Sequence, residues 1–385
     1  MDAGDLAEIV SAVRTFIRTE VVPLEERIDA EDAIPAALVD QCKEMGLYGF
    51  TIPEQYGGLG LSVTEEVELV FELGWTTPAL RSLFGTNNGI AGHVLLEGAT
   101  DEQKRAWLPR LASGEVTASF GLTEAEAGSD PSTLTTTARR EGSDWILNGS
   151  KRYITNAPVA DVIMVFARTD PDAPGNRGIS TFLVPAGTPG LTIATPDHKM
   201  GQFGAHTADV YLDEVRVPAN AVVGGEDGVN EGFRIAARCL AHGRVHIAAL
   251  CVGMAARLVD ESVEFAKVRE AGGQPIARFQ LIQGLIADSV TDYYAGRALV
   301  FDVARAYDAG TDKITGPSAA KYFCSEMVGR VADRAVQVHG GAGYMRGVAV
   351  ERFYRDARLF RIYEGTSQIQ QVIIARQVLG KATRG

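Results

Sequence analysis

Five short apolar segments in the middle of the chain constrain its fold most strongly. Gly, Pro, Asn and Asp residues separate these segments, which span residues 145–147, 162–166, 180–184, 191–193 and 210–212. Segments of this length between turn-forming residues are typical of β-strands. No helix of useful length is predicted between them, which disfavours parallel βαβ units. The pattern therefore predicts a compact, mostly antiparallel β domain.

Amphipathic helices are predicted on both sides of these strands. Before them, apolar residues recur at helical spacing between residues 10 and 17, and Ser62 and Glu65 have the spacing of a capping box. After them, a fourth helix follows Thr366, and one apolar face continues for many turns in each of the stretches 245–263, 279–304 and 315–338. Four long amphipathic helices indicate a bundle.

The order helix, sheet, helix predicts a multidomain α+β protein and excludes a Rossmann or barrel layout. We expect an N-terminal helical domain at residues 1–117, a β domain at 118–228 and a C-terminal four-helix bundle at 229–385. This order also bears on the glycines of 339–345, which are similar to a dinucleotide-binding fingerprint. They follow a predicted helix and their third glycine is out of step, so a tight connection between helices is favoured. Close approach to a phosphate-bearing ligand stays open as the alternative.

The charge and the cysteine content narrow the function further. A net charge of −12 gives no basic excess with which to bind nucleic acid. The four cysteines form no Cys-x-x-Cys pair and have no zinc-type spacing with histidine, so no metal site is expected. The acidic start of the chain lacks the positive charge of a signal or transit peptide, and no apolar run approaches membrane-spanning length. These features predict a cytoplasmic protein with no nucleic-acid or membrane partner.

Glu364 is the first candidate for chemistry. It lies between apolar neighbours and Gly365, just before a helix that Thr366 or Ser367 can cap. Burial in such a turn raises the pKa of a carboxylate towards the range of a general base, although a helix N-terminus opposes part of that rise. From these residues alone, a structural acid that complements the helix dipole is an equal alternative.

Two loops of the predicted β domain are the second candidate. Residues 120–130 and 148–156 join strand-like segments, and each loop offers hydroxyls and backbone N–H groups beside an aromatic ring. These groups suit a planar heterocycle with a polar edge. Two polar loops without a ligand fit the residues at least as well.

Together these stretches resemble the acyl-CoA dehydrogenase family along essentially the whole chain, including the order of the domains. The motifs that carry the resemblance are Leu122-Thr123-Glu124 through Gly128-Ser129-Asp130, Tyr153-Ile154-Thr155-Asn156, Gln337-Val338-His339-Gly340-Gly341 and Tyr363-Glu364-Gly365-Thr366. The resemblance implies FAD, held noncovalently between the β domain and the C-terminal bundle. It also implies a dimer or, as a dimer of dimers, a homotetramer.

Carried over by position, the resemblance assigns the contacts to FAD. In the β domain and after the base these are Phe120, Leu122, Thr123, Ser129, Tyr153, Thr155, Thr366 and Gln368, and from a neighbouring subunit they are Arg269, Gln337, Gly340 and Gly341. Two positions depart from the family pattern. Tyr153 stands where tryptophan is frequent and still offers a flat face. Gly272 stands where phenylalanine is usual, which removes an aromatic ring and predicts weaker cofactor binding.

The resemblance also implies the reaction, which is α,β-dehydrogenation of an acyl-CoA thioester to a trans-2-enoyl-CoA. Glu364 would remove the pro-R α-proton, flavin N5 would accept the β-hydride, and the electrons would pass to electron-transfer flavoprotein. The backbone N–H of Glu364 and a ribityl hydroxyl of FAD would stabilise the developing enolate. Some branches of the family place the base on the long helix, at a position that is Gly243 here, so Glu364 is the remaining candidate.

Four residues are expected at the substrate, namely Ser129, Arg244, Gly365 and Arg81. Arg244 is expected near Glu364, with the helix surface as its alternative position. Arg81 stands where the glutaryl-CoA branch has a carboxylate-binding arginine, which predicts a short or ω-carboxylated acyl chain; a surface or subunit contact is the alternative. A flavin oxidase or monooxygenase of the same fold, a non-catalytic partner subunit and a DNA-binding relative remain alternative functions.

Overall fold

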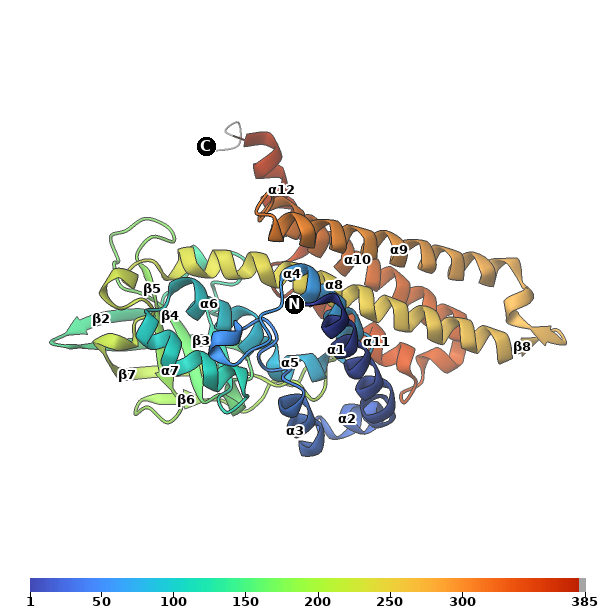
Figure 1. The fold of residues 1–385 in the computed structure, drawn as a ribbon, viewed down its shortest axis with the longest axis horizontal. Coiled ribbons are helices and arrows are strands. Elements are labelled where there is room, and N and C mark those ends of the chain that lie inside the picture. The colour runs from blue at the N-terminus through green and yellow to red at the C-terminus, as the bar shows by residue number, and fades with distance from the viewer. Residues whose placement is uncertain (381–385) are drawn as a thin grey trace.

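The computed structural model describes residues 1–380, so the last five residues of the predicted C-terminal domain lie outside the described residues. Figure 1 shows an elongated molecule with the sheet at one end, a long helical bundle at the other and the N-terminal helices packed along both. The predicted α+β class, with a helical domain, a β domain and a helical bundle in that order, is confirmed. Whether the boundaries at residues 117 and 228 separate independently folding units stays a prediction.

Seven helices build the N-terminal region. They are α1 Ala3–Phe16, α2 Glu25–Glu31, α3 Ala36–Glu44, α4 Val63–Gly74, α5 Pro78–Asn88, α6 Ile90–Gly98 and α7 Asp101–Ala112. The sequence explains where three of them begin. The predicted capping box is present at Ser62 and Glu65, and a second one, formed by Thr100 and Gln103, starts α7. Pro78 occupies the first position of α5, where its missing N–H costs no helical hydrogen bond.

One seven-stranded sheet forms the β domain. Its strands are β1 Ala118–Gly121, β2 Thr137–Glu141, β3 Asp144–Thr155, β4 Val162–Arg168, β5 Ile179–Pro185, β6 Leu191–Ile193 and β7 Thr207–Pro218. They lie in the order β1-β4-β2-β3-β7-β6, and β5 pairs with β4. Four pairs are antiparallel, as predicted, while β1 runs parallel to β4 and one residue pair joins β2 to β4 in parallel. The apolar run of β4 is explained by this central position, because six of its seven residues are buried.

The C-terminal region contains the four predicted long helices and one short helix that was not predicted. These are α8 Gly232–Val268, α9 Gln280–Asp308, α10 Thr315–His339, α11 Ala349–Ala357 and α12 Ser367–Leu379. A small hairpin, β8 Glu270–Ala271 and β9 Gln274–Pro275, joins α8 to α9 at the end of the molecule furthest from the large sheet (Figure 1). The glycines after α10 form a short 3₁₀ turn, so the favoured tight connection between helices is present there.

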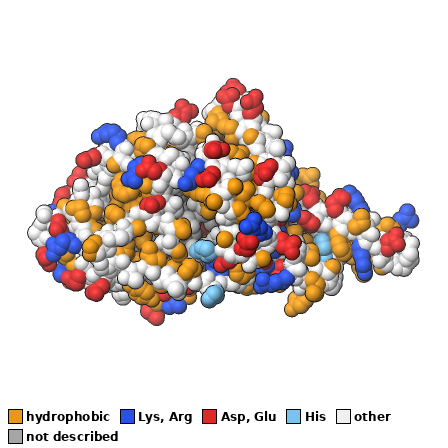
Figure 2. Space-filling view, turned by 90° about the horizontal axis from the view of Figure 1, so that it is seen from below, with side chains coloured by type: hydrophobic (Ala, Val, Ile, Leu, Met, Phe, Trp, Pro, Cys, Tyr) orange, Lys and Arg blue, Asp and Glu red, His pale blue; other side chains and the backbone are white. Residues whose placement is uncertain are grey.

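Helix α8 is the longest element and passes from the β domain into the bundle. One stretch of it is apolar and long enough to cross a membrane by length and composition, so the expectation that no run approached this length was wrong. Its most apolar window is 89% buried inside the protein, which is the behaviour of a core helix. The surface is more polar: on the face shown in Figure 2, acidic and basic side chains are interspersed with apolar ones.

Helix α4 lies against α8 at unusually close range. A Cβ added at Gly74 would lie 2.3 Å from the carbonyl oxygen of Leu250, and one added at Gly253 would lie 2.2 Å from that of Phe71. Only glycine permits this approach of two backbones. The close contact brings Glu66 of α4 beside the first half of α8, where the candidate site lies.

Candidate active site

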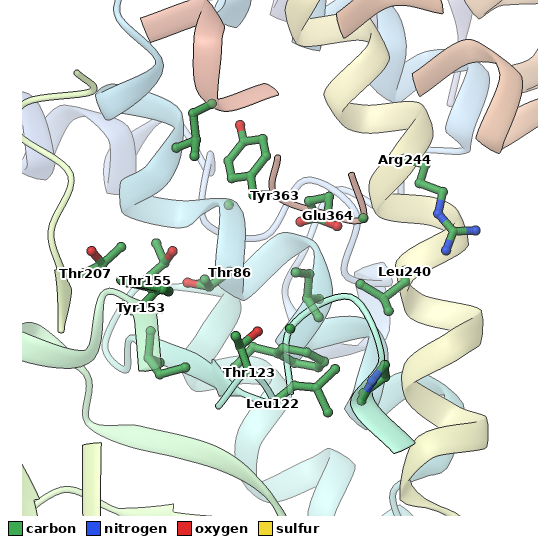
Figure 3. A pocket seen from close by; sticks show the side chains of 18 of the residues that line it. Thr86, Leu122, Thr123, Tyr153, Thr155, Thr207, Leu240, Arg244, Tyr363 and Glu364 are labelled. Carbon is green, nitrogen blue, oxygen red and sulfur yellow. The ribbon is translucent and has the colours of Figure 1, made fainter. Parts of the chain in front are cut away.

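A cavity of about 520 Å³ lies between the β domain, helices α5 and α8, and the segment before α12. Figure 3 shows side chains from each of these elements pointing into it. The predicted residues that it brings together are Arg81, Phe120, Leu122, Thr123, Ser129, Tyr153, Thr155, Arg244, Glu364 and Gly365. These residues come from five separate parts of the chain, so the cavity supports a single site.

The turn that carries Glu364 is held in an uncommon conformation. Glu364 has φ of 56°, in the left-handed region that few residues other than glycine adopt. Lys321 of α10 donates to the carbonyl of Gly365 at 2.6 Å. Gln370 donates to the carbonyls of Glu364 and Gly365 at 3.2 and 3.0 Å. Thr366 caps α12, as predicted, by accepting from the N–H of Ile369.

Gly243 of α8 makes room for the Glu364 carboxylate. A Cβ added at Gly243 would lie 2.7 Å from Oε2 of Glu364. Such contacts are essentially absent from real structures, so any larger residue would displace the carboxylate. The helix position that carries the base in some relatives therefore lies directly against Glu364 here, and its side chain is reduced to hydrogen.

Two polar groups of Glu364 have no hydrogen-bond partner among residues 1–380. Its Oε2 atom is buried and unpaired within the described part of the chain, and its backbone N–H donates no hydrogen bond to residues 1–380. Buried polar groups are nearly always paired in folded proteins, and an exception calls for an explanation. A ligand in the cavity would provide one.

Burial raises the pKa of Glu364 above its ordinary value. Positive charges oppose this rise, with Arg81 contributing most, followed by Lys321, Arg244 and His242. The prediction that Arg244 lies near Glu364 fits this arrangement, because Arg244 lines the same cavity (Figure 3). Lys321 is itself desolvated, and burial lowers its pKa to about 8.

Arg81 belongs to a buried polar cluster and not to the surface. Its Nε donates to Nε2 of His246 at 2.7 Å. Nδ1 of His246 and Nε2 of His242 each lie 2.6 Å from an oxygen of Glu66. All four side chains are at least 92% buried. Although burial would raise the pKa of Glu66, the charge of His242 and the hydrogen bonds from both imidazoles hold it well below its usual range.

Apart from Arg81, the residues of this cluster were missed from the sequence, together with Lys321 and Gln370. A signal for part of it was present, since His242 and His246 stand four residues apart on an otherwise apolar helix. Their acid partner could not be found in the same way, because Glu66 lies 176 residues before His242 and only the packing of α4 on α8 brings them together.

The β-domain wall of the cavity fits a flat ligand with a polar edge. Phe120 and Leu122 supply apolar surface, and Thr123, Ser129 and Thr155 supply hydroxyls (Figure 3 labels several of these). A Cβ added at Gly128 would meet nothing within 4 Å, so the backbone there is open to a ligand. The residues present therefore suit the isoalloxazine ring and the phosphates of FAD.

A buried ion pair holds the loop that carries this wall. Lys151 lies 2.7 Å from the carboxylate of Glu124, and both side chains are almost fully buried. Glu124 also accepts from the backbone N–H groups of Thr135 and Thr136. The two loops meet directly, because the N–H of Arg152 donates to the carbonyl of Thr123 at 2.8 Å. The predicted flavin loops are thus fixed to one another.

The remaining predicted cofactor residues do not line the cavity of this chain. Arg269 ends α8 beside the β8–β9 hairpin, and Gln337, Gly340 and Gly341 lie at the end of α10. The two helix ends meet there, where Phe265 stacks on His339 with ring centroids 4.2 Å apart. Gln368 is exposed and the hydroxyl of Thr366 is used in capping α12. Their contact with FAD stays a prediction, and for the four residues at the far helix ends it requires a second subunit.

Three family models match the chain in the order of its domains. Those for the N-terminal, middle and C-terminal domains of acyl-CoA dehydrogenase match residues 4–115, 119–215 and 230–379. The chain belongs to the acyl-CoA dehydrogenase family. It is 38% identical over 368 residues to an acyl-CoA dehydrogenase of Bacillus subtilis, covering 96% of both chains. It is 36% identical to the caffeyl-CoA reductase-Etf complex subunit CarC of Acetobacterium woodii, covering 95% of this chain and 94% of CarC.

Solved structures agree with this family assignment. The structure of butyryl-CoA dehydrogenase from Megasphaera elsdenii superimposes with a TM-score of 0.93 at 31% identity, covering 97% of this chain and 98% of that one. Membership of the acyl-CoA dehydrogenase family makes the protein an oxidoreductase that acts on acyl-CoA, and it supports FAD as the cofactor.

Proposed function

We propose that the protein dehydrogenates an acyl-CoA thioester to a trans-2-enoyl-CoA and that Glu364 removes the α-proton. The observation that supports this most is the state of Glu364. Its carboxylate lies in the cavity wall against Gly243, and Oε2 has no partner among the described residues. A base needs a free lone pair and a pKa above that of an ordinary carboxylate; the unpaired Oε2 offers the lone pair, and burial raises the pKa.

The same residue offers help with the charge that develops on the thioester oxygen. The α-proton of a thioester is too weakly acidic for a free carboxylate, so the developing enolate must be stabilised. The N–H of Glu364, which has no acceptor in the described part of the chain, is a backbone donor at the cavity, and one such donor is worth about 3 kcal/mol. Bound FAD, held by the loops around Thr123 and Tyr153, would supply the hydride acceptor.

The surrounding cations set the charge state of the base. Arg81, Lys321 and Arg244 favour ionised Glu364, while burial favours the neutral acid. This balance lets the carboxylate accept a proton without being fixed in a hydrogen-bonded ion pair. Gln370 and Lys321 hold the turn through its carbonyls, which leaves the carboxylate itself free.

We further propose that the substrate is a short or ω-carboxylated acyl chain. Arg81 lines the cavity, and only its Nε is hydrogen-bonded to another described residue, so the end of the guanidinium is free to bind a carboxylate. Turnover of glutaryl-CoA should fall strongly in Arg81→Met relative to turnover of butyryl-CoA. Equal turnover of glutaryl-CoA by parent and variant would remove this substrate proposal.

The electron acceptor is proposed to be electron-transfer flavoprotein. The name of CarC places that relative in a complex with Etf, which supports the same kind of partner here. We also propose a cytoplasmic homotetramer acting in fatty acid metabolism, with Arg269, Gln337, Gly340 and Gly341 supplied across a subunit interface. A flavin oxidase of the same fold is the competing function, and it would consume oxygen without the flavoprotein.

The test is anaerobic mixing of the FAD-loaded protein with a panel of acyl-CoA thioesters. Bleaching of the flavin absorbance and formation of the enoyl-CoA are expected with at least one short-chain or dicarboxylic thioester. Reoxidation should be fast with electron-transfer flavoprotein and slow with oxygen. A flavin that no acyl-CoA bleaches would contradict the dehydrogenase proposal, and fast reoxidation by oxygen would favour the oxidase.

A further inference from the structure

A chain of three side chains connects the cavity to the interior of the protein. It begins at Arg81 of α5, continues through His246 of α8 and ends at Glu66 of α4, with hydrogen-bond distances of 2.7 and 2.6 Å. The proton transfer proposed above uses neither His246 nor Glu66. Burial of these two polar side chains costs free energy of desolvation, so their presence in the core calls for a functional or structural reason.

The hydrogen-bond roles in this chain follow from the chemistry of its members. Arginine can only donate, so Nε2 of His246 must accept and carries no proton. The proton of neutral His246 is then on Nδ1, which donates to Glu66. His242 donates to the other oxygen of Glu66, so both carboxylate oxygens are occupied. Protonation of His246 would put an N–H against the N–H of Arg81 and break the chain.

The guanidinium of Arg81 is also confined from a second side. A Cβ added at Gly85 would lie 2.7 Å from Arg81 Cζ, so the guanidinium lies directly over this glycine. The arrangement parallels that of Glu364 over Gly243. Both charged groups at this end of the cavity therefore occupy space that a glycine leaves empty.

Building on the proposed function, we propose that His246 and Glu66 are positioning residues, which hold the Arg81 guanidinium at the Glu364 end of the cavity. Arg81 is the strongest of the positive influences on Glu364, so its placement controls how readily the base is ionised. The remaining charged groups that face Glu364 are Arg244 and His242 from α8 and Lys321 from α10.

The surroundings of His246 suit this role. Besides Arg81 and Glu66, the titratable groups that face it are His242 and His93, and the ring of Phe50 stacks in parallel at 6.3 Å. Burial, and then the charge of Arg81, lower the pKa of His246 to about 4, so the accepting tautomer persists at neutral pH. Phe50 also suggests a variant, because a phenyl ring at residue 246 preserves the stacking and removes both hydrogen bonds.

The test compares His246→Phe with His246→Gln in FAD-loaded protein. Anaerobic flavin reduction by the best acyl-CoA substrate is followed against pH. His246→Phe should slow reduction about tenfold near neutral pH and move the acid limb of the profile to higher pH, because a released Arg81 no longer lowers the pKa of Glu364. His246→Gln can still accept from Arg81 and donate to Glu66, so it should recover most of the parent rate.

A double variant separates positioning from general damage. In an Arg81→Met background, His246→Phe should have little further effect on the rate or the pH profile, because its target is gone. A parent-like pH profile in folded His246→Phe, or an equal loss in both backgrounds, would overturn the proposal. If the parent itself is not reduced by any acyl-CoA, the proposed function fails instead.

A spectroscopic measurement covers the case in which His246→Phe does not fold. Nitrogen-15 NMR of the histidine-labelled parent, with His246→Gln used to assign the signal, reports the tautomer directly. An unprotonated Nε2 and a protonated Nδ1 between pH 6 and 8 are expected. A charged imidazolium or the opposite tautomer would contradict the proposed chain.

Discussion

Glu66 and Glu364 are two glutamates that meet the same helix, α8, with opposite results. Glu66 has an imidazole N–H on each oxygen at 2.6 Å, and its pKa is held low. Within the described residues Oε2 of Glu364 is unpaired, and burial raises the pKa of Glu364 even though four positive groups oppose the rise. The two residues differ in hydrogen bonding and in exposure, because Glu66 is 1% exposed whereas Glu364 is half-buried at the cavity. An acid whose two oxygens are both hydrogen-bonded can hold other side chains in place, whereas one with an unpaired oxygen at a cavity can accept a proton.

An active Glu364→Gln variant would contradict this comparison most strongly. The amide is nearly isosteric but cannot accept the α-proton, so anaerobic flavin reduction should fall by at least about 100-fold while FAD stays bound. Stopped-flow absorbance of the flavin measures the rate. Reduction at the parent rate would show that another group is the base.

Substitution of Glu66 should lower the free energy of unfolding, whereas substitution of Glu364 should lower the rate of flavin reduction. Glu66→Leu leaves the N–H groups of His242 and His246 buried without an acceptor, which should lower the free energy of unfolding by about 3 kcal/mol. Urea denaturation measures the change. Glu68→Leu on the same helix is the control, because no hydrogen bond or ion pair of Glu68 is found among residues 1–380, and it should change stability little. Equal stability of both variants would mean that the Glu66 cluster is not structural.

Gly243→Ala tests whether the space at residue 243 positions the carboxylate of Glu364. The added methyl group would meet Oε2 at 2.7 Å and displace it, so flavin reduction should slow ten- to a hundredfold with little change in FAD content. Gly284→Ala is the matched control, since it lies in helix α9 and its Cβ would meet nothing within 4 Å. A parent-like rate for Gly243→Ala would show that the carboxylate does not depend on this space.

The smallest effect is expected from His93→Phe and depends on pH. Burial, and then the charge of His242, lower the pKa of His93 to about 3, and its Nε2 is unpaired within the described chain. In the unfolded chain His93 binds a proton near pH 6.5, whereas in the native protein it stays neutral at that pH. The free energy of unfolding therefore decreases as the pH falls below 6.5. His93→Phe should remove about 1 kcal/mol of the loss between pH 6.5 and 5.5. Urea midpoints at the two pH values measure it, and an unchanged difference would place His93 in contact with solvent.

The sequence was sufficient for the class of fold and for much of the cavity. Helical and strand periodicity gave the order of the three regions, and the capping box at Ser62 gave one helix start. The parallel pairing of β1 with β4 was not predictable. Residues 118 and 162, which pair, are separated in the chain by two other strands, β2 and β3. Helix α11 was missed as well, although its buried residues Val350, Phe353 and Ala357 recur at helical spacing.

The two glutamates show the same limit at the level of the site. Glu364 could be proposed because its neighbours in sequence form a recognisable motif. The residues that surround it could not be predicted in this way, since Lys321, Gly243 and Arg81 come from three different helices. Glu66 looked like one of several acids in an acid-rich helix. Only the contact of α4 with α8 distinguishes it from Glu65 and Glu68.

Exchange of the substrate α-hydrogen with solvent tests the central claim most directly. FAD-loaded parent, Glu364→Gln and Glu68→Gln are each incubated anaerobically in deuterium oxide with the acyl-CoA that best reduces the parent flavin, and the recovered thioester is examined by mass spectrometry and NMR. Deuterium at the α-carbon is expected with the parent and with Glu68→Gln but not with Glu364→Gln. Incorporation by Glu364→Gln at the parent rate would contradict the assignment of Glu364 as the base.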